Sequence, residues 1–205
     1  MTNELLPRHC IANLTLASWL AADAVRAFIF ANSLQEDYAD LMAGVLFLIT
    51  GFFVLCRSQP LAQDNRIGTV VLALTAAIIP LLVQWTASAP ERTEFLVVGE
   101  GTALLMMGAG LFYLRKNFSI VPQYRGIVSR GPYAVVRHPI YASYLIFDGA
   151  LVVAAHSWFA AAMWFAEGAL LMLRAEYEER LLASSDQAYN RYKKRVRWRF
   201  VPGLV

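Results

Sequence analysis

Residues 140–173 read IYASYLIFDGALVVAAHSWFAAAMWFAEGALLML and form one long, mostly apolar block. The block is longer than the roughly 20 residues that an α-helix needs to cross a bilayer. His156 and Ser157 interrupt it near the middle, which indicates a tight turn between two antiparallel helices. We therefore expect a helical hairpin whose second arm runs from Trp158 to about Leu182.

Four more apolar stretches precede this hairpin, at residues 10–31, 41–56, 67–90 and 95–114. The whole chain of 205 residues is 58% hydrophobic and 16% charged, whereas soluble domains have about 45–50% apolar and about 25% charged residues. This composition excludes a disordered or fibrous protein. The sequence predicts an all-α integral membrane protein, a multi-pass bundle of about six spans.

Basic residues indicate how this bundle is oriented. With six spans and a cytoplasmic amino terminus, 16 of the 18 lysines and arginines lie on the cytoplasmic side, all but Arg26 and Arg92. The positive-inside rule therefore places both termini in the cytoplasm. Anionic lipid headgroups, with an aromatic belt at the interface, explain the basic and aromatic tail at 189–200 better than nucleic acid does.

A polar segment at 115–137 separates the first four spans from the hairpin. Long loops of this kind are usually functional or disordered. We expect four amino-terminal spans in residues 1–114 and a cofactor-binding, catalytic region in residues 115–205, made of this loop, the hairpin and the basic tail. Cys10 and Cys56 belong to no CxxC motif or His/Cys cluster, so neither a disulfide framework nor a metal site is indicated.

The hairpin is expected to place polar groups from its two arms side by side. Pro139 suits the first turn of a helix, so His138 stands at the helix entrance, where free N–H groups favour an anion. If the turn centres on Ser157, equal distances along the arms pair His138 with about Glu176, and Tyr141 with about Leu173.

Arg174 and Glu178 are four residues apart and share one face of the second arm. The same geometry puts both beside the entrance at residues 138–141. A guanidinium, a carboxylate and an imidazole just under the headgroups are costly unless they are paired or bind a ligand. This convergence predicts a functional site on the cytoplasmic side.

The motifs around this site are GPYAVVRHPIY at 131–141, RAEYEE at 174–179, YNRY at 189–192, RV at 195–196 and PG at 202–203. Together they resemble the motifs of the isoprenylcysteine carboxyl methyltransferase family. The resemblance covers about residues 118–205. Arg197 departs from it, because the family often has proline at this position, and this puts the packing of the tail in question.

The resemblance implies S-adenosylmethionine as the methyl donor and the carboxylate of a prenylated cysteine, or a similar lipophilic acceptor, as the methyl acceptor. It also implies that Arg174 binds the acceptor carboxylate as the catalytic residue. The residues that it implies for the cofactor are Arg125, Gly126, Ile127, Val128, Tyr133, His138, Pro139, Ile140, Tyr141 and Glu178.

These residue types suit methyl transfer to a carboxylate. Such an acceptor is already ionised at neutral pH, since carboxyl pKa values lie near 4, and needs no general base. Arg174 can hold it bidentately. Glu178 can accept hydrogen bonds from a ribose or an ammonium group, and the entrance at His138 can receive the methionyl carboxylate.

Three alternatives remain open. The same scaffold could methylate a thiol or a phospholipid amine, although an amine gives Arg174 no obvious partner. Sterol reductases, which use NADPH, resemble this half of the chain. A small channel or transporter would place the acids of the spans, Asp23, Glu100, Asp148 and Glu167, along one water-filled path. We expect instead that Asp148 and Glu167 share a hydrogen bond or a proton across the hairpin.

Overall fold

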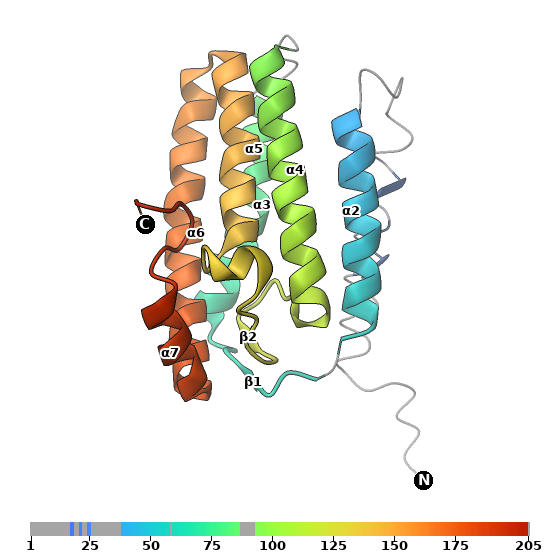
Figure 1. Ribbon diagram of the computed structural model, residues 1–205. Coiled ribbons are helices and arrows are strands. Elements are labelled where there is room, and N and C mark those ends of the chain that lie inside the picture. Colours follow the sequence, from blue (N-terminus) through green and yellow to red (C-terminus); the bar gives the residue numbers. More distant parts are fainter. Residues whose placement is uncertain are drawn as a thin grey trace. The chain divides into compact units, whose positions relative to one another are not determined.

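The computed structural model describes residues 17–18, 21, 24–25, 38–57, 59–86 and 93–204 (Figure 1). Most of the first predicted span, including Asp23 and Arg26, lies outside the described residues, as does Arg92. The chain forms two compact units: Met1–Gln59 with Leu114–Phe118, and Pro60–Tyr113 with Ser119–Val205.

The first unit contains helix α2, Tyr38–Leu55, and the 3₁₀ turn η1, Arg115–Asn117. In α2 the Thr50 hydroxyl donates to the Leu46 carbonyl at 2.7 Å, which satisfies a polar group inside an apolar helix. Arg57, just after the helix, donates to the Phe118 carbonyl at 3.3 Å.

The second unit is built mainly from helices, as the sequence predicts. Helices α3, α5 and α6 pack on one another, and Figure 1 shows them side by side. A Cβ added to Gly99 of α4 would lie 2.5 Å from the Ala150 Cβ of α5, so these two helices also approach closely. The bounds are Ile67–Thr86 for α3, Glu94–Leu114 for α4, Pro139–Ala155 for α5, Trp158–Ser185 for α6 and Gln187–Arg195 for α7.

Two residues join α5 to α6. His156 ends α5 in the left-handed conformation, with φ of 51°, and the Ser157 hydroxyl accepts a hydrogen bond from the Ala160 N–H at 3.2 Å. Such an N-cap satisfies one of the free donors of the new helix. At the other end of α5, Pro139 occupies the first turn, where its missing N–H costs nothing.

A small antiparallel sheet was not predicted from the sequence. Strand β1, Ala62–Gln63, comes from the segment before α3 and pairs with β2, Gln123–Tyr124, in the polar segment after α4. Both strands contact α6. The 3₁₀ turn η2, Gly131–Ala134, follows and leads to α5.

Within the described residues, one helix is long and apolar enough on its own to cross a bilayer, Glu94–Asn117. Three shorter apolar helices accompany it, Gly44–Leu55, Ile67–Pro80 and Pro139–Ala155. Because α6 has 28 residues, its last turns reach beyond the roughly 20 residues that a span takes.

Candidate active site

The site begins where the chain enters α5. The Arg137 and His138 N–H groups donate to the carbonyls of Trp198 and Arg199, each at 2.9 Å. Two backbone hydrogen bonds between the start of α5 and the carboxyl-terminal tail therefore hold His138 in place. Pro139 then fixes the direction of the helix.

Tyr141, in the first turn of α5, meets two side chains of α6. Its hydroxyl donates to Glu178 Oε2 at 2.7 Å, and the Arg174 guanidinium lies over its ring, 5.0 Å from the centroid. Cation–π contacts of this kind are typical within about 6 Å. Tyr141 thus joins the RHPxY motif to the distant RAEYEE motif.

The Arg174 side chain is buried and only partly satisfied. Its Nη2 donates to the Ile120 carbonyl at 2.5 Å, while its Nε is buried and has no hydrogen-bond partner among the described residues. A buried donor without a partner costs about 1–3 kcal/mol. This N–H is therefore a place where an added acceptor would be stabilised.

Aromatic rings surround the same point. His138 stacks on Tyr141, with ring centroids 5.1 Å apart and an interplanar angle of 7°. Phe200 of the tail meets both rings edge-on, at 6.0 and 6.1 Å. Phe200 is buried, so the tail packs into the site here.

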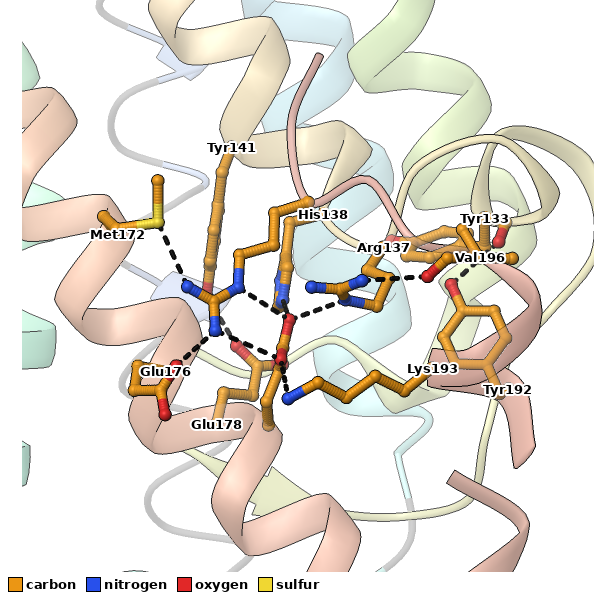
Figure 2. A network of polar contacts seen from close by, with 12 residues as sticks. Tyr133, Arg137, His138, Tyr141, Met172, Glu176, Glu178, Tyr192, Lys193 and Val196 are labelled. Carbon is orange, nitrogen blue, oxygen red and sulfur yellow. Dashed lines mark hydrogen bonds and ion pairs between the residues drawn. The ribbon is translucent and has the colours of Figure 1, made fainter. Parts of the chain in front are cut away.

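The Glu179 carboxylate collects four cationic or potentially cationic groups, and we call Glu179 and these four residues the Glu179 network (Figure 2). Their distances to it are 2.7 Å for Arg137 Nε, 3.2 Å for His138 Nε2, 2.9 Å for Lys193 Nζ and 3.3 Å for Arg199 Nε. The Arg137 guanidinium also donates to the Val196 and Arg197 carbonyls.

Burial by itself would raise the pKa of the Glu179 carboxyl. Hydrogen bonds from His138, Lys193 and Arg137 outweigh this effect and hold the pKa well below its ordinary value. The carboxyl is therefore ionised at neutral pH. An ionised carboxylate only accepts hydrogen bonds, so His138 Nε2 carries a proton in this contact.

Residues 93–184 match the sequence model of the isoprenylcysteine carboxyl methyltransferase family. This part of the chain is similar to that family. The match contains the RHPxY and RAEYEE segments and ends before α7. A comparison with curated proteins found no match. The family consists of integral membrane methyltransferases, which agrees with the apolar helices described above.

The residue pairs expected from equal distances along the two arms of the hairpin are wrong by three to five residues. His138 meets Glu179 rather than Glu176, and Tyr141 meets Glu178 rather than Leu173. Side chains of a helix tilt toward its amino terminus. In antiparallel helices this tilt brings an α5 residue against an α6 residue further along the chain than equal Cα depths suggest.

The other residues that the resemblance implies for the cofactor lie in several environments. The Ile140 side chain lies near Gly110 of α4, and Ile127 packs against Tyr189, Tyr192 and Val196.

Tyr133 and Pro139 are buried, and the Tyr133 carbonyl accepts a hydrogen bond from the Tyr192 hydroxyl at 2.7 Å. Arg125 donates to Gln123 at 2.6 Å, Gly126 has a positive φ of 119°, and Val128 is half-buried.

The acids within the helices are buried too. Asp148 of α5 and Glu167 of α6 are almost completely buried, and their carboxyl groups interact with each other. Neither Glu167 oxygen has a hydrogen-bond partner among the described residues, so the hydrogen bond or shared proton expected across the hairpin stays a prediction. Glu100 of α4 is also buried.

Sequence reasoning missed the roles of Glu179 and the tail. The Glu179 side chain is only 1% exposed and pairs with basic groups from two other segments, Arg137 and Lys193. Tyr189, Tyr192 and Phe200 were expected in an interfacial belt and are buried instead. One sequence signal could have indicated the pairing of the tail with Glu179. No acid follows Asp186 in the sequence, so the cations of the tail can pair only with carboxylates from other segments.

Proposed function

We propose that this protein transfers a methyl group from S-adenosylmethionine to the carboxylate of a lipophilic acceptor of the isoprenylcysteine type. The observation that carries the proposal is the joint contact of Arg174 and Glu178 with Tyr141. It brings the two family motifs together around a buried guanidinium whose Nε has no hydrogen-bond partner among the described residues.

The residues around Tyr141 fit the chemical groups of S-adenosylmethionine. The Glu178 carboxylate has acceptor capacity beyond the bond from Tyr141 and suits hydroxyl or ammonium donors. The stacked His138 and Tyr141 rings, with Tyr133 nearby in the motif, offer aromatic surface. When bound, this cofactor supplies an electrophilic methyl group on a positively charged sulfur.

The His138 N–H already donates to the Arg199 carbonyl, so a methionyl carboxylate at the entrance of α5 would need other donors there. In our proposal the cofactor therefore depends on the Glu178 carboxylate and on the ring surface of His138 rather than on this one backbone donor.

Arg174 is the residue that we assign to the acceptor. Its buried Nε–H and the N–H of Nη2 on the same edge of the guanidinium can hold a carboxylate through two parallel hydrogen bonds, while the second N–H of Nη2 stays on the Ile120 carbonyl. One acceptor oxygen then forms the new bond to the methyl carbon. The carbon–sulfur bond breaks, its electron pair stays on sulfur, and the products are a methyl ester and S-adenosylhomocysteine. The protein supplies alignment and exclusion of water, and needs no general base.

The proposal includes the membrane arrangement expected from the sequence. It consists of about six spans, cytoplasmic termini and a cofactor site at the cytoplasmic interface, formed by the helical hairpin of α5 and α6 and by the loop and tail of residues 115–205. Anionic headgroups would contact the exposed cations of the tail, Arg191, Lys194, Arg195 and Arg197.

The test is methyl transfer from a donor with a radiolabelled methyl group, using purified protein in detergent. The acceptor panel holds N-acetyl-S-farnesylcysteine, a fatty acid, a lipophilic thiol and phosphatidylethanolamine. We expect labelled product from the prenylcysteine, released as methanol by mild base because a methyl ester is base-labile. Base-stable label on the thiol or the amine, with none on either carboxylate, would refute the proposed acceptor.

A further inference from the structure

Three separate segments of the chain meet at the Glu179 carboxylate. Arg137 and His138 come from the start of α5, Glu179 itself from the last turns of α6, and Lys193 and Arg199 from α7 and the tail. Figure 2 shows the Arg137, His138 and Lys193 side chains pointing toward one point. The carboxylate therefore ties the tail to the entrance of α5.

His138 is fixed from two directions by this arrangement. Its backbone N–H donates to the Arg199 carbonyl at 2.9 Å, and its ring contacts the Glu179 carboxylate at 3.2 Å. The held ring stacks on Tyr141, whose hydroxyl bonds to Glu178. Glu179 thus helps to fix the orientation of His138, which in turn contacts Tyr141, one of the groups that we assign to the cofactor.

Stability alone is a weak reason for such a network. Glu179 is 1% exposed and Arg137 is 6% exposed, and buried ion pairs often stabilise a protein no more than apolar side chains of similar volume do. Their directional contacts, in contrast, fix one arrangement of the segments that they join. Such a role suits a site that needs two rings held at a set distance.

Glu176 provides a natural comparison on the same helix. It also pairs with Arg199 and forms an i,i+4 pair with Arg180, but it is 34% exposed, and its ion pairs are with these two arginines rather than with the start of α5. The two carboxylates share one cation and differ in whether they contact His138.

We propose that Glu179 is a positioning residue of the cofactor site, which orients His138, and through it Tyr141, by fastening the tail to the start of α5. This inference rests on the proposed function. It assigns to Glu179 no contact with the cofactor or the acceptor.

The experiment compares Glu179→Gln with Glu176→Gln in the full-length protein. Affinity for S-adenosylhomocysteine is measured by calorimetry, the KM for N-acetyl-S-farnesylcysteine by methyl transfer, and the melting temperature in parallel. We expect E179Q to bind S-adenosylhomocysteine at least about tenfold more weakly, as for one charge-assisted hydrogen bond lost. E176Q should stay within about twofold, and the acceptor KM should change less than the affinity, because Arg174 lies outside the network.

Glu179→Asp keeps the charge on a shorter side chain and covers the case that E179Q does not fold. We expect E179D to fold and to bind more weakly than the wild type but more tightly than E179Q. A lower melting temperature with unchanged affinity, in E179Q or E179D, would show a structural role only and overturn the inference. A wild-type protein that does not bind S-adenosylhomocysteine would refute the proposed function, and this inference with it.

Discussion

Replacing Arg174 by lysine keeps the positive charge on α6 and removes the planar fork of N–H donors. In the structure Arg174 places Nη2 on the Ile120 carbonyl at 2.5 Å and its guanidinium over Tyr141 at 5.0 Å, and its Nε points to no partner among the described residues. A lysine ammonium can hold the carbonyl or an acceptor carboxylate. It cannot hold both at the fixed angle that the guanidinium provides.

The expected loss is one charge-assisted hydrogen bond to the acceptor in the transition state. Such a bond contributes about 1.5–3 kcal/mol, which corresponds to a roughly 10- to 150-fold decrease in kcat/KM. Affinity for S-adenosylhomocysteine should stay within about twofold, because the bond between Tyr141 and Glu178 is unchanged. Arg174→Ala should lower turnover further, since it removes both bonds and the charge.

The assay is methyl transfer to N-acetyl-S-farnesylcysteine, with cofactor affinity measured on the same preparations. Arg180→Lys is the matched control, because Arg180 lies on the same helix, also over a tyrosine ring, Tyr177 at 5.7 Å, and its side chain is 68% exposed. We expect the control to keep wild-type activity. An R174K protein that loses as much cofactor affinity as turnover, or that matches R180K in activity, would refute the role given to Arg174.

Three further predictions concern cofactor affinity, acid stability and a tight turn. Glu178→Ala should weaken S-adenosylhomocysteine binding by about 1.5–3 kcal/mol, and unchanged affinity in calorimetry would place the pocket elsewhere. Because the pKa of Glu179 is lowered in the folded protein, its ionised form stabilises the fold at neutral pH, and this contribution is lost as the pH falls below the ordinary glutamate pKa of about 4.5. The melting temperature should therefore drop between about pH 5 and pH 3 and drop less in E179Q; parallel curves would contradict this. Gly131→Ala should destabilise the protein by at least about 1 kcal/mol, since Gly131 has φ of +59° and a Cβ there would lie 2.4 Å from the Tyr113 ring; Tyr113→Ala should relieve part of this loss in denaturation experiments.

The pattern of apolar runs and the motifs predicted most of what positions the site. Helices α2 to α6 follow the apolar runs, and the break at His156–Ser157 separates α5 from α6. The meeting of Tyr141 with Arg174 and Glu178 followed from the length of the two arms, because a helix advances by a constant 1.5 Å per residue.

The details that failed depend on side-chain direction and on contacts distant in sequence. The expectation from equal Cα depth paired His138 with Glu176 instead of Glu179, because it did not include the tilt of the side chains on either helix. The pairing of Ala62 with Tyr124 joins two-residue strands, which are too short to show the alternating apolar pattern that predicts a strand. Arg199 is half-buried and pairs with Glu179, 20 residues earlier in the chain, and such a distant contact has no signal in the local sequence.

The most direct test of the account is a calorimetric titration of the wild-type protein with S-adenosylhomocysteine and, separately, with NADPH. The arrangement of Glu178, Tyr141 and His138 predicts saturable binding of S-adenosylhomocysteine that Glu178→Ala weakens, and no saturable binding of NADPH. Tight binding of NADPH, with none of S-adenosylhomocysteine, would contradict the account and favour a reductase.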